Sequence, residues 1–152
     1  MADLVLRAAL PAEVGALSEL AMRSKAYWGY DAEFLEACRD ELTFTATDVP
    51  RIVVAESAGT LVGMYTVDGR PPHGVLGNLW VDPSAIGSGI GRHLWTHAIS
   101  SARTRGFAHL MIDADPNAEG FYLRMGAERI GESPSGSIPG RVLPLLQVNV
   151  LS

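Results

Sequence analysis

Three alternating glycines, Gly87, Gly89 and Gly91, stand just before a segment of helical periodicity, where they could form an anion site. They follow an apolar run that ends at Val81 and a turn that contains Pro83. A helix N-terminus leaves several backbone N–H groups without partners and carries a partial positive charge, so a phosphate bound there is stabilised. Glycine lets the backbone approach a ligand closely and adopt positive φ at little cost. The stretch therefore predicts a phosphate site, although glycine-rich turns between a strand and a helix are often only turns.

Two side chains in this stretch, Ser88 and Arg92, add a hydroxyl and a forked cation suited to phosphate. Two familiar phosphate loops do not fit. A Walker loop ends in Gly-Lys-Ser/Thr, whereas Gly91 is followed here by Arg92 and His93. The dinucleotide fingerprint follows its strand immediately and needs a third glycine where Arg92 stands, but residues 82–86 intervene.

Composition limits the classes of protein to which the chain can belong. Its 152 residues suit a single domain, 1–152, with a core of its own. A hydrophobic content of 47% with 19% charged residues is typical of a soluble globular protein. The net charge of −5 argues against a nucleic-acid partner and mildly favours a cationic one. The single Cys38 excludes an internal disulfide, and no metal ligand set is expected. Without a signal peptide or a membrane-spanning run, we expect a cytoplasmic protein with no membrane partner.

The order of apolar patterns predicts an α/β protein. Residues 51–56 and 60–67 have the composition of an antiparallel hairpin. The strand that ends at Val81, the helix after the glycine loop and a strand at 107–112 have the spacing of a parallel crossover. An exposed edge at the closing strand would allow a homodimer. The remaining expected elements are a strand at 4–7, helices at 11–22 and 31–42, a helix from Asp115 to Met125 with Asp115 as its N-cap, a loop at 132–141 and a closing strand at 142–150.

An aromatic-rich connector, residues 24–30, joins the first two expected helices. Its aromatic side chains include Trp28 and Tyr30. Aromatic residues in a connector commonly cover the core. The alternative is that Trp28 and Tyr30 form a wall of a substrate site.

Residues 79–83 (Leu-Trp-Val-Asp-Pro), followed by residues 87–94 (Gly-Ser-Gly-Ile-Gly-Arg-His-Leu), resemble the strand, loop and helix that bind acetyl-coenzyme A in the GNAT N-acetyltransferase superfamily. The family usually has Arg or Gln where this sequence has Ile86. That departure removes one side-chain donor near the pyrophosphate and leaves the backbone amides of the loop.

A second block, within residues 117–127, resembles the later signature of the same family, with Asn117-Ala118, Phe121-Tyr122 and Gly126-Ala127. Two such blocks in this order, one crossover apart, are far more specific than either block alone. The resemblance covers most of the chain from Arg51 to Ile130.

The resemblance implies the GNAT acyl-CoA N-acyltransferase fold, a mixed, largely antiparallel twisted sheet of about six or seven strands with about four helices. It implies an enzyme that transfers the acetyl group of acetyl-CoA directly to a primary amine of a small molecule or a peptide. It also implies that Tyr122 is the general acid and that Trp28 and Tyr30 line the acceptor site. The residues implied to bind acetyl-CoA are Leu79, Trp80, Val81, Ile86, Gly87, Ser88, Gly89, Ile90, Gly91, Arg92, Asn117 and Tyr122.

Acetyl transfer needs a neutral amine, a site for the developing oxyanion and a proton for the leaving thiolate. The family implies that the backbone N–H of Val81 contacts the acetyl carbonyl and that the Tyr122 hydroxyl donates to the thiolate. No Ser or Cys is placed for a covalent acyl-enzyme, so direct attack is expected. The general base is not identified: Asp113, Glu56 and His73 are candidates.

Two other functions stay open at this stage. A protein that binds or senses acyl-CoA without turnover is favoured slightly by Ile86 and by the missing base, whereas Tyr122 and Asn117 favour the enzyme. A nucleotide-binding α/β module is disfavoured by the spacing of the glycine loop.

Overall fold

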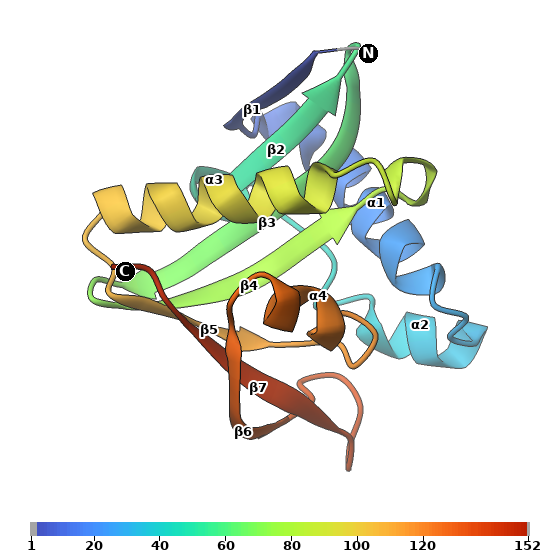
Figure 1. The fold of residues 1–152 in the computed structure, drawn as a ribbon. Helices are drawn as coiled ribbons and strands as arrows, with labels where there is room; N and C mark the ends of the chain where they lie inside the picture. The colour runs from blue at the N-terminus through green and yellow to red at the C-terminus, as the bar shows by residue number, and fades with distance from the viewer. Residues whose placement is uncertain (1–2, 152) are drawn as a thin grey trace.

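The computed structural model describes residues 3–151 and contains one sheet of seven strands in the order β1-β2-β3-β4-β5-β7-β6 (Figure 1). Neighbouring strands are antiparallel except β4 and β5, which are parallel. The mixed, largely antiparallel sheet agrees with the fold expected from the sequence. The strands are β1 (Leu4–Ala8), β2 (Ile52–Ser57), β3 (Thr60–Arg70), β4 (His73–Val81), β5 (His109–Asp113), β6 (Glu128–Pro134) and β7 (Val142–Asn149). The described helices are α1 (Val14–Ala26), α2 (Ala32–Cys38), α3 (Ile90–Thr104) and α4 (Glu119–Arg124), with short 3-10 turns at Pro11–Glu13, Ala46–Arg51 and Pro83–Ala85.

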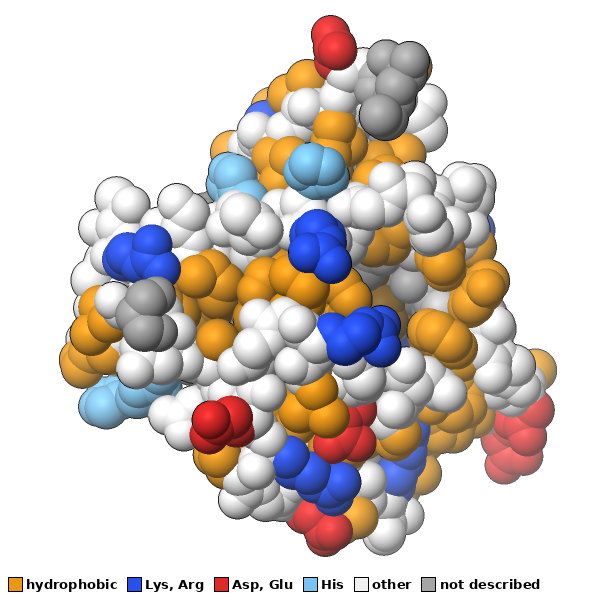
Figure 2. Space-filling model, in the orientation of Figure 1, with side chains coloured by type: hydrophobic (Ala, Val, Ile, Leu, Met, Phe, Trp, Pro, Cys, Tyr) orange, Lys and Arg blue, Asp and Glu red, His pale blue; other side chains and the backbone are white. Residues whose placement is uncertain are grey.

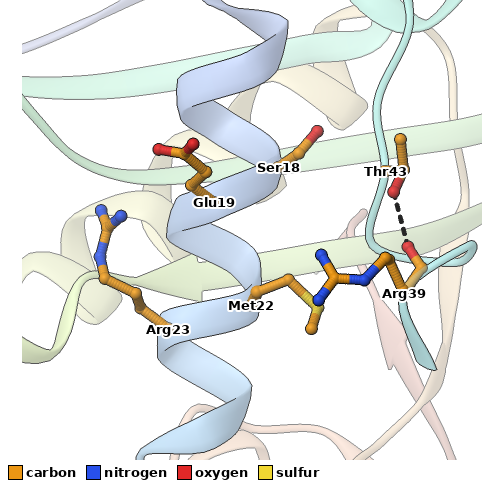
Figure 3. A pocket seen from close by; sticks show the side chains of 6 residues that line it. All are labelled: Ser18, Glu19, Met22, Arg23, Arg39 and Thr43. Atoms are coloured by element: carbon orange, nitrogen blue, oxygen red, sulfur yellow. Dashed lines mark hydrogen bonds between the residues drawn. The ribbon is translucent and has the colours of Figure 1, made fainter. Parts of the chain in front are cut away.

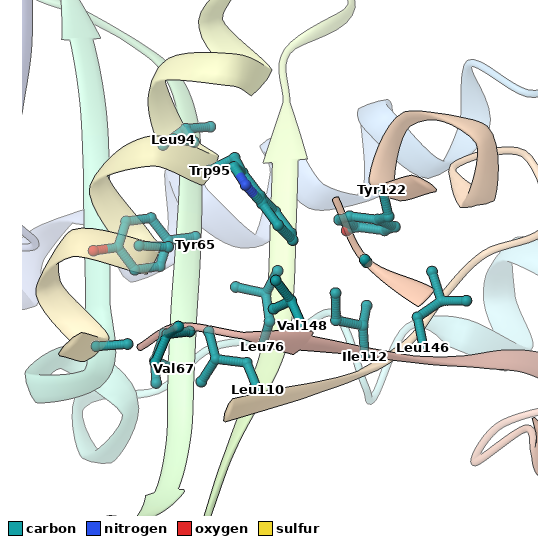
Figure 4. Packing of buried hydrophobic residues seen from close by; sticks show 14 of the residues in the cluster. Tyr65, Val67, Leu76, Leu94, Trp95, Leu110, Ile112, Tyr122, Leu146 and Val148 are labelled. Carbon is teal, nitrogen blue, oxygen red and sulfur yellow. The ribbon is translucent and has the colours of Figure 1, made fainter. Parts of the chain in front are cut away.

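Helices cover both faces of the sheet: α3 and α4 lie on one face, and α1 and α2 on the other (Figure 1). Helix α3 buries one apolar stripe, in which Leu94, Ala98 and Ala102 recur every four residues. The α3 side holds a core cluster that includes Trp95 and Tyr122 (Figure 4). No helix within residues 3–151 is long and apolar enough to cross a membrane.

Strands β4 and β5 pair only over their first residues and then separate. Their register runs from His73 opposite His109 to Val75 opposite Met111 and stops there. Beyond Val75, β4 continues to Val81 with β3 as its only partner among the described strands. This divergence, visible in Figure 1, opens a splay between the two parallel strands. We call it the β4–β5 splay.

A β-bulge in β4 lies where the splay begins. Thr66 pairs with Asn78 and Val67 pairs with Leu76, so Gly77 has no partner on β3. The extra residue reverses the alternation of side chains along the strand. As a result, Leu76 and the odd-numbered residues Leu79 and Val81 all pack on the α3 side, while Trp80 packs on the α1 side.

The first helix is longer than predicted, because α1 continues through Ala26 into the segment expected to be a connector. Its buried face includes Leu17 and Ala21, and a further step of four residues brings Lys25 onto that face. The buried ammonium is tolerated because it pairs with Asp115. Only residues 27–31 join α1 to α2.

The predicted N-cap of the last helix was wrong. Helix α4 begins at Glu119, with Ala118 as its N-cap. The Asp115 carboxylate accepts from the backbone N–H of Asn117, and the Asp115 carbonyl accepts from that of Ala118, so Asp115 closes a turn ahead of the helix. The same carboxylate also accepts a hydrogen bond from Lys25.

The sequence suggested that the closing strand is an exposed edge of the sheet, and this prediction was wrong. β7 lies between β5 and β6, because residues 128–134, part of which was expected to be loop, form a strand beside it. Among the described strands, β1 and β6 form the edges of the sheet. Because both sides of β7 are already paired, two copies of the chain cannot dimerise by pairing their β7 strands edge to edge.

Candidate active site

The glycine loop has the backbone of an anion site at the start of α3. Gly87 and Gly89 have φ of 89° and 88°, in the left-handed region that favours glycine. No side chain of residues 3–151 caps the N-terminus of α3, and the first intrahelical hydrogen bond is from His93 N–H to the Gly89 carbonyl. The amides of residues 90–92 therefore have no partner within the helix. Donors without partners, on a loop with no Cβ at its two strained positions, fit the pyrophosphate of coenzyme A.

The side chains of this loop differ in whether they can donate to a bound anion. The Ser88 hydroxyl donates to the Ala85 carbonyl and is thus engaged within the loop. The Ile86 side chain is 40% exposed and offers no donor. Arg92 is exposed in the first turn of α3, and Gly91 is close-packed, since a Cβ there would lie 3.4 Å from the Phe121 ring.

Cationic side chains stand over the face that carries α3 and α4. Figure 2 shows Lys or Arg side chains over the middle of this face, with apolar side chains between them. Arg92 at the start of α3 and Arg124 at the end of α4 are both exposed. Positive charge on either side of an apolar surface suits a ligand with phosphates and an apolar arm.

The backbone of β4 presents donors to the splay. The Asp82 N–H donates to the Val62 carbonyl of β3, and in an antiparallel pair successive residues point to opposite sides. The N–H of Val81 is therefore directed away from β3, toward the side that β5 leaves open. Leu79 has the same orientation. Trp80, which lies between these two residues along the strand, has the opposite orientation. Its indole N–H donates to the Asn78 side chain on the opposite face of the sheet.

Tyr122 of α4 is buried against the splay, only 7% exposed. Its ring lies 5.8 Å from that of Trp95 of α3, and the two face one another across the core (Figure 4). No group among residues 3–151 hydrogen-bonds to its hydroxyl. Burial, with a smaller effect from the Asp115 charge, raises the pKa of Tyr122 well above its ordinary value. The hydroxyl is thus a protonated donor without a protein acceptor.

A buried ionic cluster, which we call the Asp115 cluster, borders the wide end of the splay. It comprises Lys25, Tyr30, Asp115, Asn117 and Arg141. The Lys25 ammonium lies 2.6 Å from the Asp115 carboxylate, and the two side chains are 10% and 9% exposed. The Tyr30 hydroxyl donates to Asp115 at 2.9 Å and accepts from Arg141 at 2.9 Å and from the Asn117 amide at 3.0 Å. Segments distant in sequence are thereby joined at one point.

Ionisation in the Asp115 cluster follows from these bonds. Burial acts to raise the pKa of Asp115, but hydrogen bonds from Lys25, the Asn117 backbone and Tyr30 outweigh it and hold that pKa below its ordinary value. Burial and the Asp115 charge raise the pKa of Tyr30, so it stays a neutral phenol. Asp115 is a fully bonded carboxylate and a poor candidate for a base.

The structure brings together only some of the residues predicted from the sequence. Tyr30 and Asn117 lie in the Asp115 cluster, whereas Trp28 is 43% exposed and contacts the Tyr27 ring edge-on. Sequence reasoning missed Lys25, whose position on the apolar stripe of α1 was the available signal. It gave Asp115 a capping role only.

The three candidate bases are separated widely. Glu56 is bonded to Arg7 at 2.7 Å between β1 and β2. His73 contacts His109, 3.1 Å between ring nitrogens, at the paired end of β4 and β5. Asp113 is exposed at the end of β5, beyond the last residue paired with β4, and makes no ion pair within residues 3–151. Of the three, only Asp113 lies at the open part of the splay.

One hollow of about 330 Å³ lies on the outer side of α1 (Figure 3). Ser18, Glu19, Met22 and Arg23 line it from α1, and Arg39 and Thr43 line it from the segment at and after the end of α2. No residue of the candidate site lines this hollow. It therefore does not mark the site that the backbone and Tyr122 define.

Comparison with known proteins identifies acetyltransferases as relatives of this chain. Residues 16–127 match the family described as the acetyltransferase (GNAT) family. The chain is also 30% identical over 138 residues to the 5-NmdU N-acetyltransferase of Pseudomonas phage PaMx11, an alignment that covers 88% of this chain and 93% of the phage protein.

Solved structures share the fold along nearly the whole chain. The PaiA N-acetyltransferase of Thermoplasma acidophilum, solved in complex with coenzyme A, has a TM-score of 0.81 at 16% identity and covers 97% of this chain and 99% of its own. A GCN5-related N-acetyltransferase of Rhodopseudomonas palustris also has a TM-score of 0.81, at 24% identity, covering 98% and 97%. At these identities the likeness concerns the fold.

Proposed function

Because the chain belongs to the GNAT acetyltransferase family, we propose that it transfers the acetyl group of acetyl-CoA to a primary amine of a small molecule or peptide, with Tyr122 as proton donor. The observation that supports Tyr122 most directly is its hydroxyl, which has no hydrogen-bond partner among residues 3–151 and keeps some access to solvent although the residue is only 7% exposed. The protein is an acetyl-CoA-dependent N-acetyltransferase; the acceptor and the residue roles are the proposal.

Coenzyme A would be held by the α3 loop and the open edge of β4. The amides at the start of α3 would bind the pyrophosphate, with Arg92 as an added cation. The backbone of Leu79 and Val81 would bind the pantetheine arm as an added strand binds a sheet edge. The Asn117 amide is engaged with Tyr30 and Asp115, so it would act on the arm through its remaining acceptor oxygen or after a change of partner.

The chemistry would use groups on both faces of the sheet. Bound acetyl-CoA supplies a thioester whose carbonyl carbon accepts the amine. The Val81 N–H would donate to the carbonyl oxygen as negative charge develops there. The Tyr122 hydroxyl, kept protonated by its raised pKa, would donate to the sulfur as the carbon–sulfur bond breaks.

The amine must lose a proton before or during attack, because a lysine-type amine has a pKa of about 10.4. Asp113 is the best-placed of the three candidate bases, since it lies at the open part of the splay without an ion pair among the described residues. Alternation along β5 places it on the opposite face from Ile112, which packs with Tyr122 in the core. We propose that Asp113 accepts the amine proton directly or through a water.

A non-catalytic acyl-CoA sensor of the same fold was the alternative reading of the sequence. The comparisons give that reading no support, because both the family and the phage relative are named as acetyltransferases. The named relative modifies 5-NmdU, which directs the first acceptor screens toward amines on small molecules as well as on peptides.

Thermal unfolding with added ligands, followed by a thiol-release assay, tests this function. A ligand bound only by the folded state raises the midpoint. We expect acetyl-CoA and CoA to raise it and NAD to leave it unchanged, and at least one amine to release thiol from acetyl-CoA. A protein whose midpoint responds to NAD and not to CoA would refute the assignment.

A further inference from the structure

The Asp115 cluster holds more positive charge than negative. Lys25 and Arg141 are cations, Asp115 is the carboxylate between them, and Tyr30 and Asn117 are neutral. The two cations lie near one another, because both stand over the ring of Tyr30, at 5.1 Å for the Lys25 ammonium and 5.4 Å for the Arg141 guanidinium. Both cations share one carboxylate, since Arg141 lies 3.9 Å from Asp115 in addition to the closer Lys25, so the cluster carries one positive charge in excess of what buried groups normally balance.

The cluster also has more hydrogen-bond donors than acceptors. An ammonium carries three N–H donors and a guanidinium five. Toward residues 3–151, Lys25 uses one donor, to Asp115, and Arg141 uses one nitrogen, to Tyr30. Asp115 already accepts from Lys25, Tyr30 and both nitrogens of Asn117. The Arg141 side chain is 19% exposed, so its free edge can be reached from outside.

A carboxylate near this cluster is Glu41, which lies against Gly136 in the loop that leads to Arg141. Glu41 is exposed and makes no ion pair within residues 3–151. The Cys38 thiol stays neutral, because burial raises its pKa and outweighs the opposing charges of Lys25 and Arg141. Among the described residues, neither group forms an ion pair with Arg141.

The cluster lies where an acceptor would approach. Its members come from the end of α1, the following connector, the turn between β5 and α4, and the loop before β7. The turn between β5 and α4 leads from one limb of the splay to the helix of Tyr122. The Asp115 charge also contributes to the raised pKa of Tyr122.

Resting on the function proposed above, we propose that the amine acceptor carries a carboxylate, which binds at the free donors of Arg141 and Lys25. The planar guanidinium matches a carboxylate in a two-bond geometry, and the desolvated setting strengthens it. Arg141 would thus determine specificity for the acidic end of the acceptor, while its amine faces the splay.

A binding measurement tests the anion site without any amine. The protein saturated with CoA is heated with glutarate or with glutaramide at constant ionic strength. We expect glutarate alone to raise the midpoint and R141Q to abolish that rise, while R129Q, the same change at an exposed arginine of β6, keeps it. CoA should still raise the midpoint of R141Q, which shows that the variant is folded.

Three results would overturn the carboxylate site. They are equal midpoints with glutarate and glutaramide, a glutarate effect that persists in R141Q, and a glutarate effect that appears only in E41Q, which would identify Glu41 as the counter-ion. A midpoint that does not respond to CoA would instead refute the proposed function, so the two failures are distinguishable.

Turnover provides the second measurement. γ-Aminobutyrate is compared with its carboxamide, whose amine is remote enough to keep a similar pKa. We expect kcat/KM at least about tenfold higher for the acid, and loss of that preference in R141Q but not in R129Q. Equal kcat/KM values would contradict the inference and leave the acetyltransferase intact. If neither amine reacts while CoA binds, the glutarate measurement decides.

Discussion

The Lys25 ammonium bonds to the Asp115 carboxylate at 2.6 Å across 90 residues of sequence, and both side chains are about nine-tenths buried. The bond ties the end of α1 to the turn before α4. It therefore holds the connector that contains Tyr30 close to the turn that leads into α4, the helix of Tyr122.

Removing Lys25 should destabilise the protein strongly, because it leaves Asp115 buried without its closest counter-charge. We expect K25M to lower the free energy of unfolding by about 3 kcal/mol or more. R23M, two residues away on the same helix, removes a bond to Asp82 from an arginine that is 52% exposed. It should cost less than about 1 kcal/mol. Urea unfolding measures both, and equal losses would contradict a structural role for the buried pair.

Acid should weaken the same pair. The pKa of Asp115 is lower in the folded protein than its ordinary value of about 3.9, because its hydrogen bonds outweigh desolvation. Its contribution to stability is therefore present above about pH 4 and is lost as the pH falls through the folded-state pKa. We expect urea midpoints below pH 4 to fall less steeply in D115N than in the wild type. Parallel slopes would contradict the assignment.

Several of these features follow from the sequence alone. Period-four repeats fixed α3, the composition of residues 51–67 indicated the hairpin, and the spacing of strand, helix and strand indicated the parallel β4–β5 pair. Each is a local pattern whose physical cause lies within a few residues. The glycine loop was readable for the same reason, since positive φ at Gly87 and Gly89 requires glycine.

The remaining features could not be predicted from the sequence, because they depend on bonds between residues far apart in the chain. Asp115 has the sequence context of an N-cap, but its carboxylate is bonded to a lysine 90 residues away. Tyr30 was one of two aromatic candidates, and only its hydroxyl partners, from residues 115–117 and 141, separate it from Trp28. Strand β6 has few apolar residues of its own and forms because β7 pairs with it.

Alanine at Gly89 should impair coenzyme binding. The φ of 88° is unfavourable for any side chain by about 1–2 kcal/mol, so G89A should distort the loop before α3. We expect a KM for acetyl-CoA raised about tenfold. G15A is the matched control: Gly15 is helical and a Cβ there meets no atom within 4 Å. It should leave KM unchanged, and an equal rise in both variants would argue against a special role for the loop.

Arginine at position 86 should strengthen coenzyme binding by restoring the donor that the family usually has there. The side chain of Ile86 is 40% exposed, so I86R has room. A charge-assisted hydrogen bond of about 1.5 kcal/mol would lower the Kd for CoA about tenfold. I130R adds the same charge at an exposed position of β6 and should not change the Kd. Calorimetric titration checks this, and equal affinities for the wild type and I86R would contradict it.

The most direct test of the account is the kcat of Y122F against that of Y65F. Both residues are buried tyrosines of one core cluster, but the Tyr65 hydroxyl contacts His97 at 2.7 Å, whereas that of Tyr122 has no partner among residues 3–151. If Tyr122 donates to the leaving sulfur, Y122F should lower kcat by about 10²-fold or more with the Kd for CoA unchanged, and Y65F should keep its kcat. A Y122F enzyme with wild-type kcat would contradict the account.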